Sequence, residues 1–232
     1  MKEKIVFIGA GNLGTALAKE LYKNGFQVQQ VYSRTQKSAK ELADKIESNF
    51  IISVKDIIAD AGIYFVTLKD SAWSEVLPFI NFGNGLVVHC SGSMPLLELH
   101  KYTSNCGVLY PLQTFSKARD VDFSSIPVFI ESESEKIVGI LKEIAGSISK
   151  KVTVLNSERR LYLHIAAVFA CNFVNHFYEQ ASDVLKTKGI PFGVLKPLIN
   201  ETAQKVQELD PFDAQTGPAV RYDENIIRKH LD

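Results

Sequence analysis

The sequence lacks an excess of charge of either sign, because 26 basic residues balance 26 acidic ones and neither kind forms a long run. This balance argues against a nucleic-acid or other polyanionic partner, which normally requires a concentrated basic surface. The first residues, MKEKIVFIGAG, contain neither the long apolar region nor the small-residue cleavage site of a signal peptide. We therefore expect a cytoplasmic protein.

Cysteine is also scarce. Cys90, Cys106 and Cys171 are widely spaced among apolar or small residues, which suits reduced and mostly buried thiols better than disulfides. The sequence contains no CxxC or HExxH pattern, so we predict no metal site.

We expect no membrane contact either, because the uncharged run 161–178 contains histidine and asparagine side chains that would be costly in lipid.

Strand and helix patterns alternate along the first two thirds of the chain. Short β-rich runs are KIVFIG, QVQQVYS, NFII, GIYFVTL, GLVVHC, GVLYPL, IPVFIES and KVTVL. Helical patterns begin at Asn12 and cover 36–47, 71–80 and 133–147. This alternation predicts an α/β fold, a Rossmann doubly wound and mainly parallel sheet.

After Leu155 the strand patterns stop and only helical ones remain. The predicted helices cover 157–187, 192–209 and 221–231. We therefore predict a Rossmann domain over 1–155 and a smaller all-helical domain over 156–232.

The segment from Gly9 to Gly14 reads GAGNLG and fits the GxGxxG pattern. An apolar strand precedes it and a helical pattern follows, which is the context of a dinucleotide-binding turn. In such turns the first glycine allows the tight bend, the second (Gly11) lets a pyrophosphate approach, and the third lets helix and strand pack closely. Together with Asn12 and Leu13 at the helix N-terminus, this segment predicts a phosphate site.

The end of the second predicted strand indicates which dinucleotide binds. An NAD site usually has an acidic residue about 20 residues after the glycines, to bind the ribose hydroxyls. The chain has no acid between Lys23 and Lys40, and it has Ser33, Arg34 and Thr35 at the strand end. Hydroxyls and a guanidinium suit a 2′-phosphate, so we predict NADP(H) rather than NAD(H). An exposed arginine at a strand end, without a ligand, is the alternative.

Ligands of open α/β sheets lie beyond the carboxyl ends of the strands. Thr67, Leu68 and Lys69 follow the fourth predicted strand and are candidate neighbours of the cofactor. His89 and Ser91, at the end of the fifth, are candidate catalytic residues near the nicotinamide, although a histidine ending a buried strand is often only structural.

The sixth predicted strand is followed by Gln113 and Thr114, whose amide and hydroxyl are candidate substrate ligands. Pro111 leaves open that this segment is only a rigid turn.

Several longer segments resemble a known family. GAGNLGTALA, HCSGSMPLLEL, GVLYPLQTFS, HIAAVFACNFVNHFYEQA and the segment from PFGVLKPL to IIRKHL are similar to Rossmann-like proteins with a C-terminal domain of unknown function 2520. Members are often labelled NADP- or deazaflavin-dependent oxidoreductases. The chain is more distantly similar to pyrroline-carboxylate reductases, ketopantoate reductases and β-hydroxyacid dehydrogenases. Together these resemblances imply an NADP-binding domain over 1–155, followed by helices over 156–232 that complete the substrate site and form a homodimer.

Two positions depart from these patterns. The family typically has a histidine where this chain has Tyr110, so a role assigned to that histidine does not carry over. The β-hydroxyacid dehydrogenases have a catalytic lysine four residues before an asparagine, whereas four residues before Asn172 this chain has Val168. His164, one turn further back, is the candidate replacement.

The segment 161–180 predicts a helix with one polar stripe. At about 100° per residue, His164, Asn175, Glu179, Asn172 and His176 fall within roughly 120° of each other. Because the stripe has no charged residue before Glu179, a polar enclosed cleft fits it better than a solvated face. His164 is then the candidate proton donor, Asn172 orients the substrate, and Asn175 is a further substrate ligand. Burial of the stripe in a helix-paired dimer is the alternative.

These observations predict an NADP(H)-dependent oxidoreductase that transfers hydride to or from a small carbonyl, imine or hydroxy-acid substrate in the crevice between the domains. A non-catalytic NADP(H)-binding sensor or dimeric interaction protein is the alternative. Hydride exchange with a deazaflavin is a third hypothesis, implied by the family resemblance alone.

Overall fold

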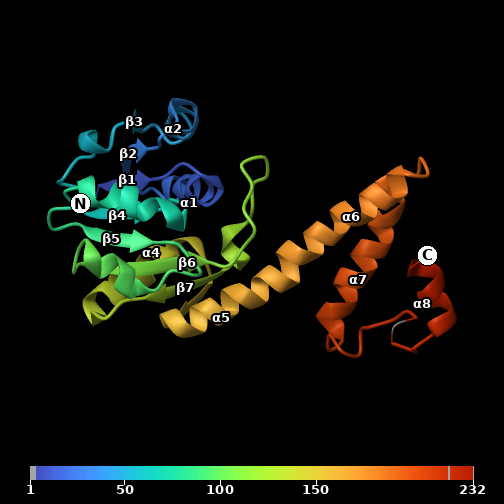
Figure 1. Cartoon of the computed structure of the whole chain (residues 1–232). Helices are drawn as coiled ribbons and strands as arrows, with labels where there is room; N and C mark the ends of the chain where they lie inside the picture. Colours follow the sequence, from blue (N-terminus) through green and yellow to red (C-terminus); the bar gives the residue numbers. More distant parts are fainter. Residues whose placement is uncertain (1–3, 219, 232) are drawn as a thin grey trace. The chain divides into compact units, whose positions relative to one another are not determined.

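The computed structural model of the chain describes residues 4–218 and 220–231 (Figure 1). The chain forms two compact units, one reaching Cys171 and the other beginning at Asn172. The predicted domain boundary near 155 follows the last strand, and the first compact unit continues beyond it into a helix.

A single eight-stranded sheet forms the centre of the first unit, with strand order β3-β2-β1-β4-β5-β6-β7-β8. The strands are β1 (Ile5–Ile8), β2 (Val28–Tyr32), β3 (Asn49–Ile51), β4 (Ile63–Val66), β5 (Leu86–His89), β6 (Cys106–Pro111), β7 (Pro127–Glu131) and β8 (Lys151–Val154). All neighbouring strands are parallel except β6 and β7. The predicted Rossmann sheet is confirmed, and each predicted strand segment contains one of these strands, except that β6 begins one residue before its predicted segment GVLYPL.

Both faces of the sheet are covered, which is why the central strands β1, β4, β5 and β6 are buried along their whole length. In β1, Ile5 and Phe7 belong to one core cluster, whereas Val6 and Ile8 belong to the other. The helices α1 (Asn12–Lys23), α2 (Gln36–Ala43) and α4 (Glu135–Ile148) pack on the first face. The short helices α3 (Trp73–Val76), η3 (Leu77–Phe79) and η4 (Leu96–Lys101) pack on the second.

The predicted helix over 71–80 is broken into short pieces. The 3-10 helix η2 (Asp70–Ala72), α3 and η3 follow each other, and Pro78 lies in the first turn of η3. Proline cannot donate a backbone hydrogen bond and disfavours the helical conformation of the residue before it. A continuous α-helix therefore ends before this position.

The predicted long helix over 157–187 contains a π-helical turn. It consists of α5 (Ser157–Ala167), the π segment η6 (Val168–Phe173) and α6 (Val174–Lys186). A π turn is wider than an α turn, because its hydrogen bonds join residues five apart. The step of about 100° per residue does not hold across such a turn, so the predicted alignment of Asn172 and Asn175 with His164 is not supported.

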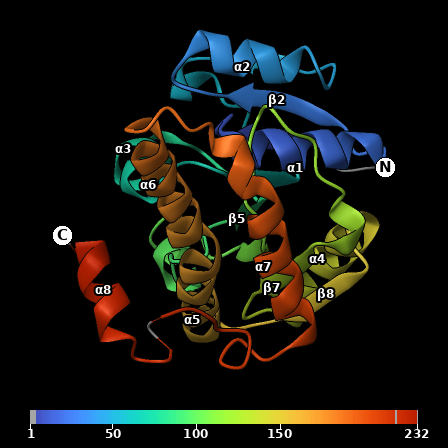
Figure 2. The same ribbon diagram turned by 90° about the vertical axis from the view of Figure 1, so that its right-hand side faces the viewer.

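The second unit exposes much of its apolar surface. Figures 1 and 2 show α6 and α7 (Lys196–Glu208) running in opposite directions from the turn near Gly189, which precedes the 3-10 helix η7 (Phe192–Leu195). Neither α6 nor α7 has a buried residue, and Phe177, Val184 and Leu198 are each more than 60% exposed. The last helix is α8 (Glu224–Leu231). No helix among the described residues has both the length and the apolarity needed to cross a membrane.

Candidate functional site

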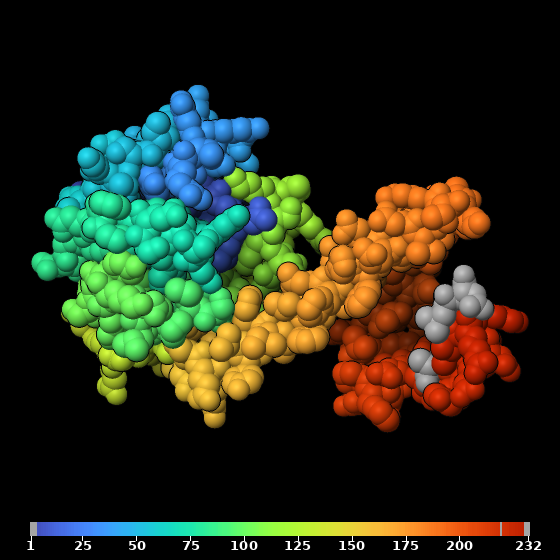
Figure 3. All heavy atoms as spheres, in the orientation of Figure 1, coloured from blue at the N-terminus to red at the C-terminus, as the bar shows by residue number. Residues whose placement is uncertain are grey.

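A cavity of about 470 Å³ lies at the carboxyl ends of the central strands. Figure 3 shows dark blue atoms set back there between the teal and green parts of the surface. The volume of the cavity is in the range of small-molecule sites. It is lined by residues 11–13, 66–70 and 90–93 and by Tyr110, Pro111, Gln113, Phe115 and His164. All of them belong to the first compact unit, and we refer to this cavity as the crevice.

The glycine turn between β1 and α1 is packed tightly against the end of β4. Gly9 has a φ of +119°, which favours glycine, and a Cβ on it would lie 2.7 Å from the carbonyl oxygen of Thr67. The hydroxyl of Thr67 donates to the carbonyl of Gly9 at 2.8 Å. A Cβ on Gly14 would lie 2.5 Å from the same hydroxyl. The first and third glycines thus have the packing roles that their pattern predicts.

Gly11 fits the remaining role, the approach of a pyrophosphate, because a Cβ there would meet no atom within 4 Å. That role stays a prediction. The backbone of Gly11 is extended, with φ −76° and ψ −168°. Gly11 is the N-cap residue of α1, and no side chain accepts a hydrogen bond from the first N–H groups of the helix at this position. The first turn of α1 has no acidic residue, so its backbone N–H groups and partial positive charge are open to a phosphate. These residues fit a dinucleotide pyrophosphate.

The start of α2 offers a second place for an anion. Thr35 is the N-cap of α2, makes no side-chain cap bond, and is followed by a first turn without acidic residues. Arg34 lies beside it, and its guanidinium is 3.8 Å from the carboxylate of Glu75, with both side chains more than 60% exposed. Such an exposed pair contributes little and leaves Arg34 able to bind phosphate. Ser33 is half-buried at the end of β2.

A buried arginine joins the start of α5 to the sheet. Arg160 is 1% exposed, pairs with Glu131 of β7, and donates to the carbonyl of Met94. In the same turn, the hydroxyl of Ser157 accepts a hydrogen bond from the backbone N–H of Leu96 at 2.9 Å. These bonds fix α5 beside the segment that follows β5. Breaking such a buried pair typically costs several kcal/mol.

His164 lies one turn further along α5 and lines the crevice. Its Nδ1 is 2.9 Å from the hydroxyl oxygen of Tyr110, which stands at the end of β6. Burial raises the pKa of Tyr110, while the charge of Arg160 opposes this shift. A Cβ on Gly92 would lie 2.5 Å from Nδ1 of His164, so only glycine leaves room for the imidazole there.

His89 ends β5 but does not line the crevice. It is fully buried, its Nδ1 accepts a hydrogen bond from the backbone N–H of Ser91, and its ring contacts Trp73 edge-on at 5.2 Å. Burial, followed by the charge of Arg160, lowers the pKa of His89 to about 3. The structure therefore favours the structural role of His89 over the catalytic one.

The other predicted residues divide into two groups. Asn12, Leu13, Thr67, Leu68, Lys69, Ser91 and Gln113 line the crevice. Thr114 is exposed and does not line it, and its backbone N–H donates to the side chain of Gln113 at 2.8 Å. Asn172 and Asn175 belong to the second unit and are exposed there, so their roles stay predictions.

Sequence reasoning missed four residues that shape the crevice. The only sequence feature that could have indicated Asp70 is its position directly after Lys69. For Arg160 it is a charged side chain at the start of a helical segment that is otherwise largely apolar. Tyr110 stands out in the sequence only as a departure from a family pattern, and Gly92 carries no local signal. Among the described residues, no cluster of potential metal ligands is found, and Cys90 and Cys106 are buried free thiols while Cys171 is exposed.

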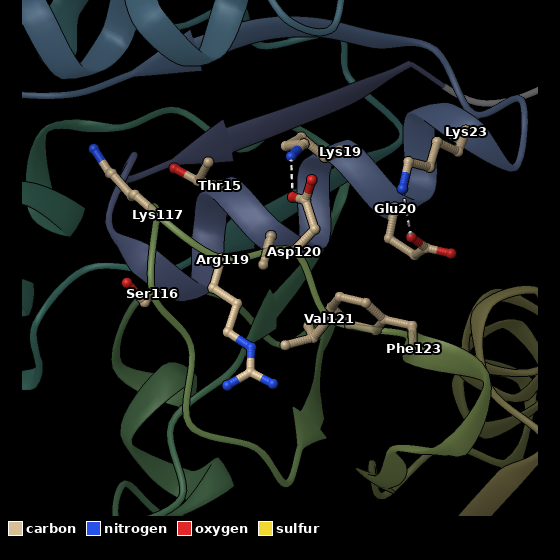
Figure 4. A pocket seen from close by; sticks show the side chains of 11 residues that line it. Thr15, Lys19, Glu20, Lys23, Ser116, Lys117, Arg119, Asp120, Val121 and Phe123 are labelled. Atoms are coloured by element: carbon tan, nitrogen blue, oxygen red, sulfur yellow. Dashed lines mark hydrogen bonds and ion pairs between the residues drawn. The ribbon is translucent and has the colours of Figure 1, made fainter. Parts of the chain in front are cut away.

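A second hollow lies between α1 and the segment that follows β6 (Figure 4). Its volume is about 20 Å³, close to that of one water molecule. Lys19 of α1 forms an ion pair with Asp120, and Lys23 is 3.6 Å from Glu20. The pair of Lys19 and Asp120 connects the segment that follows β6 to α1, and the same segment contributes Phe115 to the lining of the crevice.

The fold and the crevice define a nicotinamide-nucleotide-binding protein. Residues 4–91 match the family model of coenzyme F420-dependent NADP oxidoreductases, and residues 126–232 match the domain of unknown function 2520. A solved structure of a candidate NADP oxidoreductase from Bacteroides fragilis is 49% identical, with 99% of this chain and 90% of that chain covered and a TM-score of 0.96. The chain therefore belongs to the family of NADP oxidoreductases that carry this C-terminal domain.

Two more distant structures share the fold. The 1-pyrroline-5-carboxylate reductase of Streptococcus pyogenes is 15% identical, with 99% and 92% of the two chains covered and a TM-score of 0.70. A reductive aminase from Aspergillus terreus, solved with NADPH, is 13% identical, with 89% and 76% covered and a TM-score of 0.66. Among proteins with curated descriptions, no sequence matches significantly.

The glycine turn generates a matched pair of variants. Gly11→Ala should leave the melting temperature nearly unchanged, because its Cβ enters open space, but should abolish measurable NADPH binding by obstructing the phosphates. Gly14→Ala should lower the free energy of unfolding by about 1–3 kcal/mol, because its Cβ collides with Thr67. Thermal melts and NADPH titration measure both. Unimpaired NADPH binding by a folded Gly11→Ala variant would contradict the assigned phosphate site.

His89 generates a prediction about pH. Its pKa is about 3 in the folded chain and about 6.5 when unfolded, so between these values only the unfolded chain takes up the proton. The free energy of unfolding should therefore decrease as the pH falls below 6.5, by up to about 1.4 kcal/mol per pH unit from this residue. His89→Asn keeps a hydrogen-bond acceptor and should remove this residue's contribution to the dependence of the free energy of unfolding on pH. Denaturant titrations at several pH values measure that dependence. The same change at exposed His176 should leave the contribution of His89 in place. An unchanged pH dependence in His89→Asn would refute the assignment.

Proposed function

We propose that this NADP-dependent oxidoreductase transfers hydride to or from a small carbonyl, imine or hydroxy-acid carbon in the crevice. The observation that carries the proposal is that one cavity holds both the glycine turn, which suits a pyrophosphate, and the hydrogen-bonded pair of Tyr110 and His164. The bound nicotinamide would supply the hydride chemistry, and the side chains would supply orientation and the proton.

NADP(H) rather than NAD(H) is the proposed cofactor. The support comes from the start of α2, where Arg34, the hydroxyls of Ser33 and Thr35, and an uncapped helix N-terminus lie together. No acidic residue stands at the end of β2 or in the first turn of α2, and the nearby carboxylate of Glu75 belongs to α3. A 2′-phosphate would gain charge-assisted hydrogen bonds from this group, whereas the segment itself offers a ribose hydroxyl no carboxylate. Lys69, exposed at the edge of the crevice, is a further candidate partner for the cofactor's phosphates.

His164 is the proposed proton donor, and Tyr110 is its partner. When a charged imidazole gives up its Nε2 proton, the neutral ring that remains keeps its proton on Nδ1, so the hydroxyl oxygen of Tyr110 can accept a hydrogen bond from Nδ1–H both before and after the transfer. Tyr110 can therefore hold the ring in both protonation states while Nε2 exchanges a proton with the substrate. Imidazole suits this task because it exchanges protons near neutral pH. Asn172 and Asn175 remain proposed substrate ligands, and Ser91 and Gln113 are nearer candidates because they line the crevice.

A homodimer is the proposed assembly. The support is the apolar surface of the second unit, where Phe177 and Val184 of α6 and Leu198 and Val206 of α7 are each more than 40% exposed. Exposed apolar side chains on neighbouring helices are characteristic of a surface that a protein partner covers. A second copy of this chain would bring the same helices to such an interface.

Arg34 tests the cofactor assignment. Arg34→Ala should weaken NADPH binding by about 10- to 100-fold, because it removes charge-assisted hydrogen bonds to the 2′-phosphate, and should leave NADH binding within about twofold. Calorimetric titration with both cofactors measures this difference. Glu75→Gln is the matched control, since it frees Arg34 from its acidic neighbour and should not weaken NADPH binding. Equal losses for both cofactors in Arg34→Ala would refute the preference for NADP(H).

His164 tests the proposed reaction. NADPH oxidation should be followed with a panel of carbonyl and imine compounds. His164→Ala should reduce kcat by about 100-fold or more with the best of them, because it removes the proton donor, while the Kd for NADPH stays unchanged. Tyr110→Phe should reduce kcat less, and His100→Ala, outside the crevice, should not reduce it.

Turnover of His164→Ala at the wild-type rate would exclude this residue as proton donor. Bound NADPH that no compound of the panel oxidises would instead favour a non-catalytic NADP(H)-binding sensor. Oxidation only after a deazaflavin is added would favour the third hypothesis from the sequence.

A further inference from the structure

One carboxylate lines the crevice and has no role in the proposed reaction. Asp70 is the first residue of η2, directly after Lys69, and is only half-buried. Its Oδ2 accepts hydrogen bonds from the hydroxyls of Ser91 at 3.1 Å and Ser93 at 2.7 Å, both in the segment that follows β5. The carboxylate therefore joins the ends of β4 and β5 at the edge of the sheet where the nicotinamide is expected.

The two serines hold the carboxylate in a fixed position. The hydroxyl oxygen of Ser91 accepts hydrogen bonds from the backbone N–H groups of Ser93 at 3.2 Å and Met94 at 3.1 Å. Because two donors already occupy this oxygen, its own proton is left for Asp70. The position of the negative charge is thus determined by the backbone of the 91–94 turn.

The carboxylate has no cationic partner within the part of the chain that the structure describes. None of the ion pairs there includes Asp70, and its Oδ1 accepts no hydrogen bond from a described residue. Lys69 is the other charged residue of fixed sign that lines the crevice, and its side chain is exposed at the edge. A partly buried carboxylate without a counter-charge favours a positively charged ligand next to it.

We propose that Asp70 is a specificity-determining residue that selects for positive charge, so that the substrate is a protonated imine and not an oxo acid or hydroxy acid. This inference rests on the proposed function and narrows its substrate class. When hydride adds to an iminium carbon, a C–H bond forms and the π electrons of the C=N bond move to nitrogen. His164, as the proton donor, would protonate the imine nitrogen before this step. The substrate then becomes a neutral amine, and its positive charge passes to the oxidised nicotinamide ring. One positive charge thus stays near Asp70 throughout the reaction.

A carboxylate substrate would lack this match. The anionic group of an oxo acid or hydroxy acid would enter beside Asp70, and like charges repel. Arg34 lies at the start of α2 and is not among the lining residues, so among them only Lys69 offers a fixed positive charge to such a group. The charge of Asp70 therefore favours the binding of an iminium substrate over the binding of a carboxylate substrate.

The test compares ligands of opposite charge and similar size on the NADPH-loaded protein. Pyrrolidinium and cyclopentanecarboxylate should be titrated at equal ionic strength, with the fluorescence of bound NADPH as the readout. The wild-type protein should bind pyrrolidinium at least about tenfold more tightly, and Asp70→Asn should reduce this preference to about twofold or less. Asparagine can still accept from the serines, and a thermal melt checks that the variant is folded.

The two forms of the cofactor give an independent readout. Because only the oxidised ring is positively charged, Asp70→Asn should raise the Kd for NADP⁺ by about tenfold and change that for NADPH by no more than about twofold. Lys69→Met is the matched control. It should weaken both forms equally, because their phosphates are identical.

Three results would overturn the inference. The first is that the wild-type protein binds cyclopentanecarboxylate as tightly as pyrrolidinium, or more tightly. The second is that Asp70→Asn leaves the preference for pyrrolidinium unchanged. The third is that Asp70→Asn weakens the binding of NADP⁺ and NADPH equally, which would make Asp70 a ligand of the ribose. The wild-type comparison decides even if Asp70→Asn does not fold. Failure to bind NADPH at all would contradict the proposed function itself, whereas NADPH binding without charge selection would contradict only the role of Asp70.

Discussion

The crevice depends on one contact, between the end of β4 and the glycine turn that joins β1 to α1. Thr67 donates to the carbonyl of Gly9 and occupies the space that a side chain on Gly14 would need. This packing brings the two strand ends together where the order of the sheet reverses, since β1 lies between β2 and β4. It leaves Gly11 facing open space, and ligands of doubly wound sheets bind at this kind of position.

Local patterns in the sequence were sufficient to predict the sheet. Each strand is a short apolar run bounded by polar or turn-forming residues, and the glycine pattern has the same meaning wherever a strand precedes it and a helix follows. The helical segments were less predictable, because Pro78 breaks one of them and a π turn over Val168–Phe173 widens another. A π turn has no sequence signature, so the angular alignment of the polar residues on either side of it could not be tested by counting.

Apart from His164 on α5, the predicted residues that line the crevice follow strands or the glycine turn directly. Thr67, Lys69 and Ser91 lie together there because the carboxyl ends of parallel strands meet at one edge. The pairing of Tyr110 with His164 joins positions 54 residues apart, and Arg160 reaches Met94 over 66 residues. Such contacts follow from the packing of α5 on the sheet and leave no pattern in the local sequence. The buried ion pair of Arg160 sets this packing and so determines where His164 lies.

The central claim is that the nicotinamide of a bound cofactor lies beside His164, in a crevice whose other charged residues are Lys69 and Asp70. A crystal structure of the protein with NADP⁺ is the most direct measurement. The account predicts the pyrophosphate against Gly11 and the start of α1, the 2′-phosphate near Arg34, and the nicotinamide C4 facing a space that Nε2 of His164 borders. A nicotinamide on the far side of the sheet edge from His164, or a pyrophosphate away from Gly11, would contradict it.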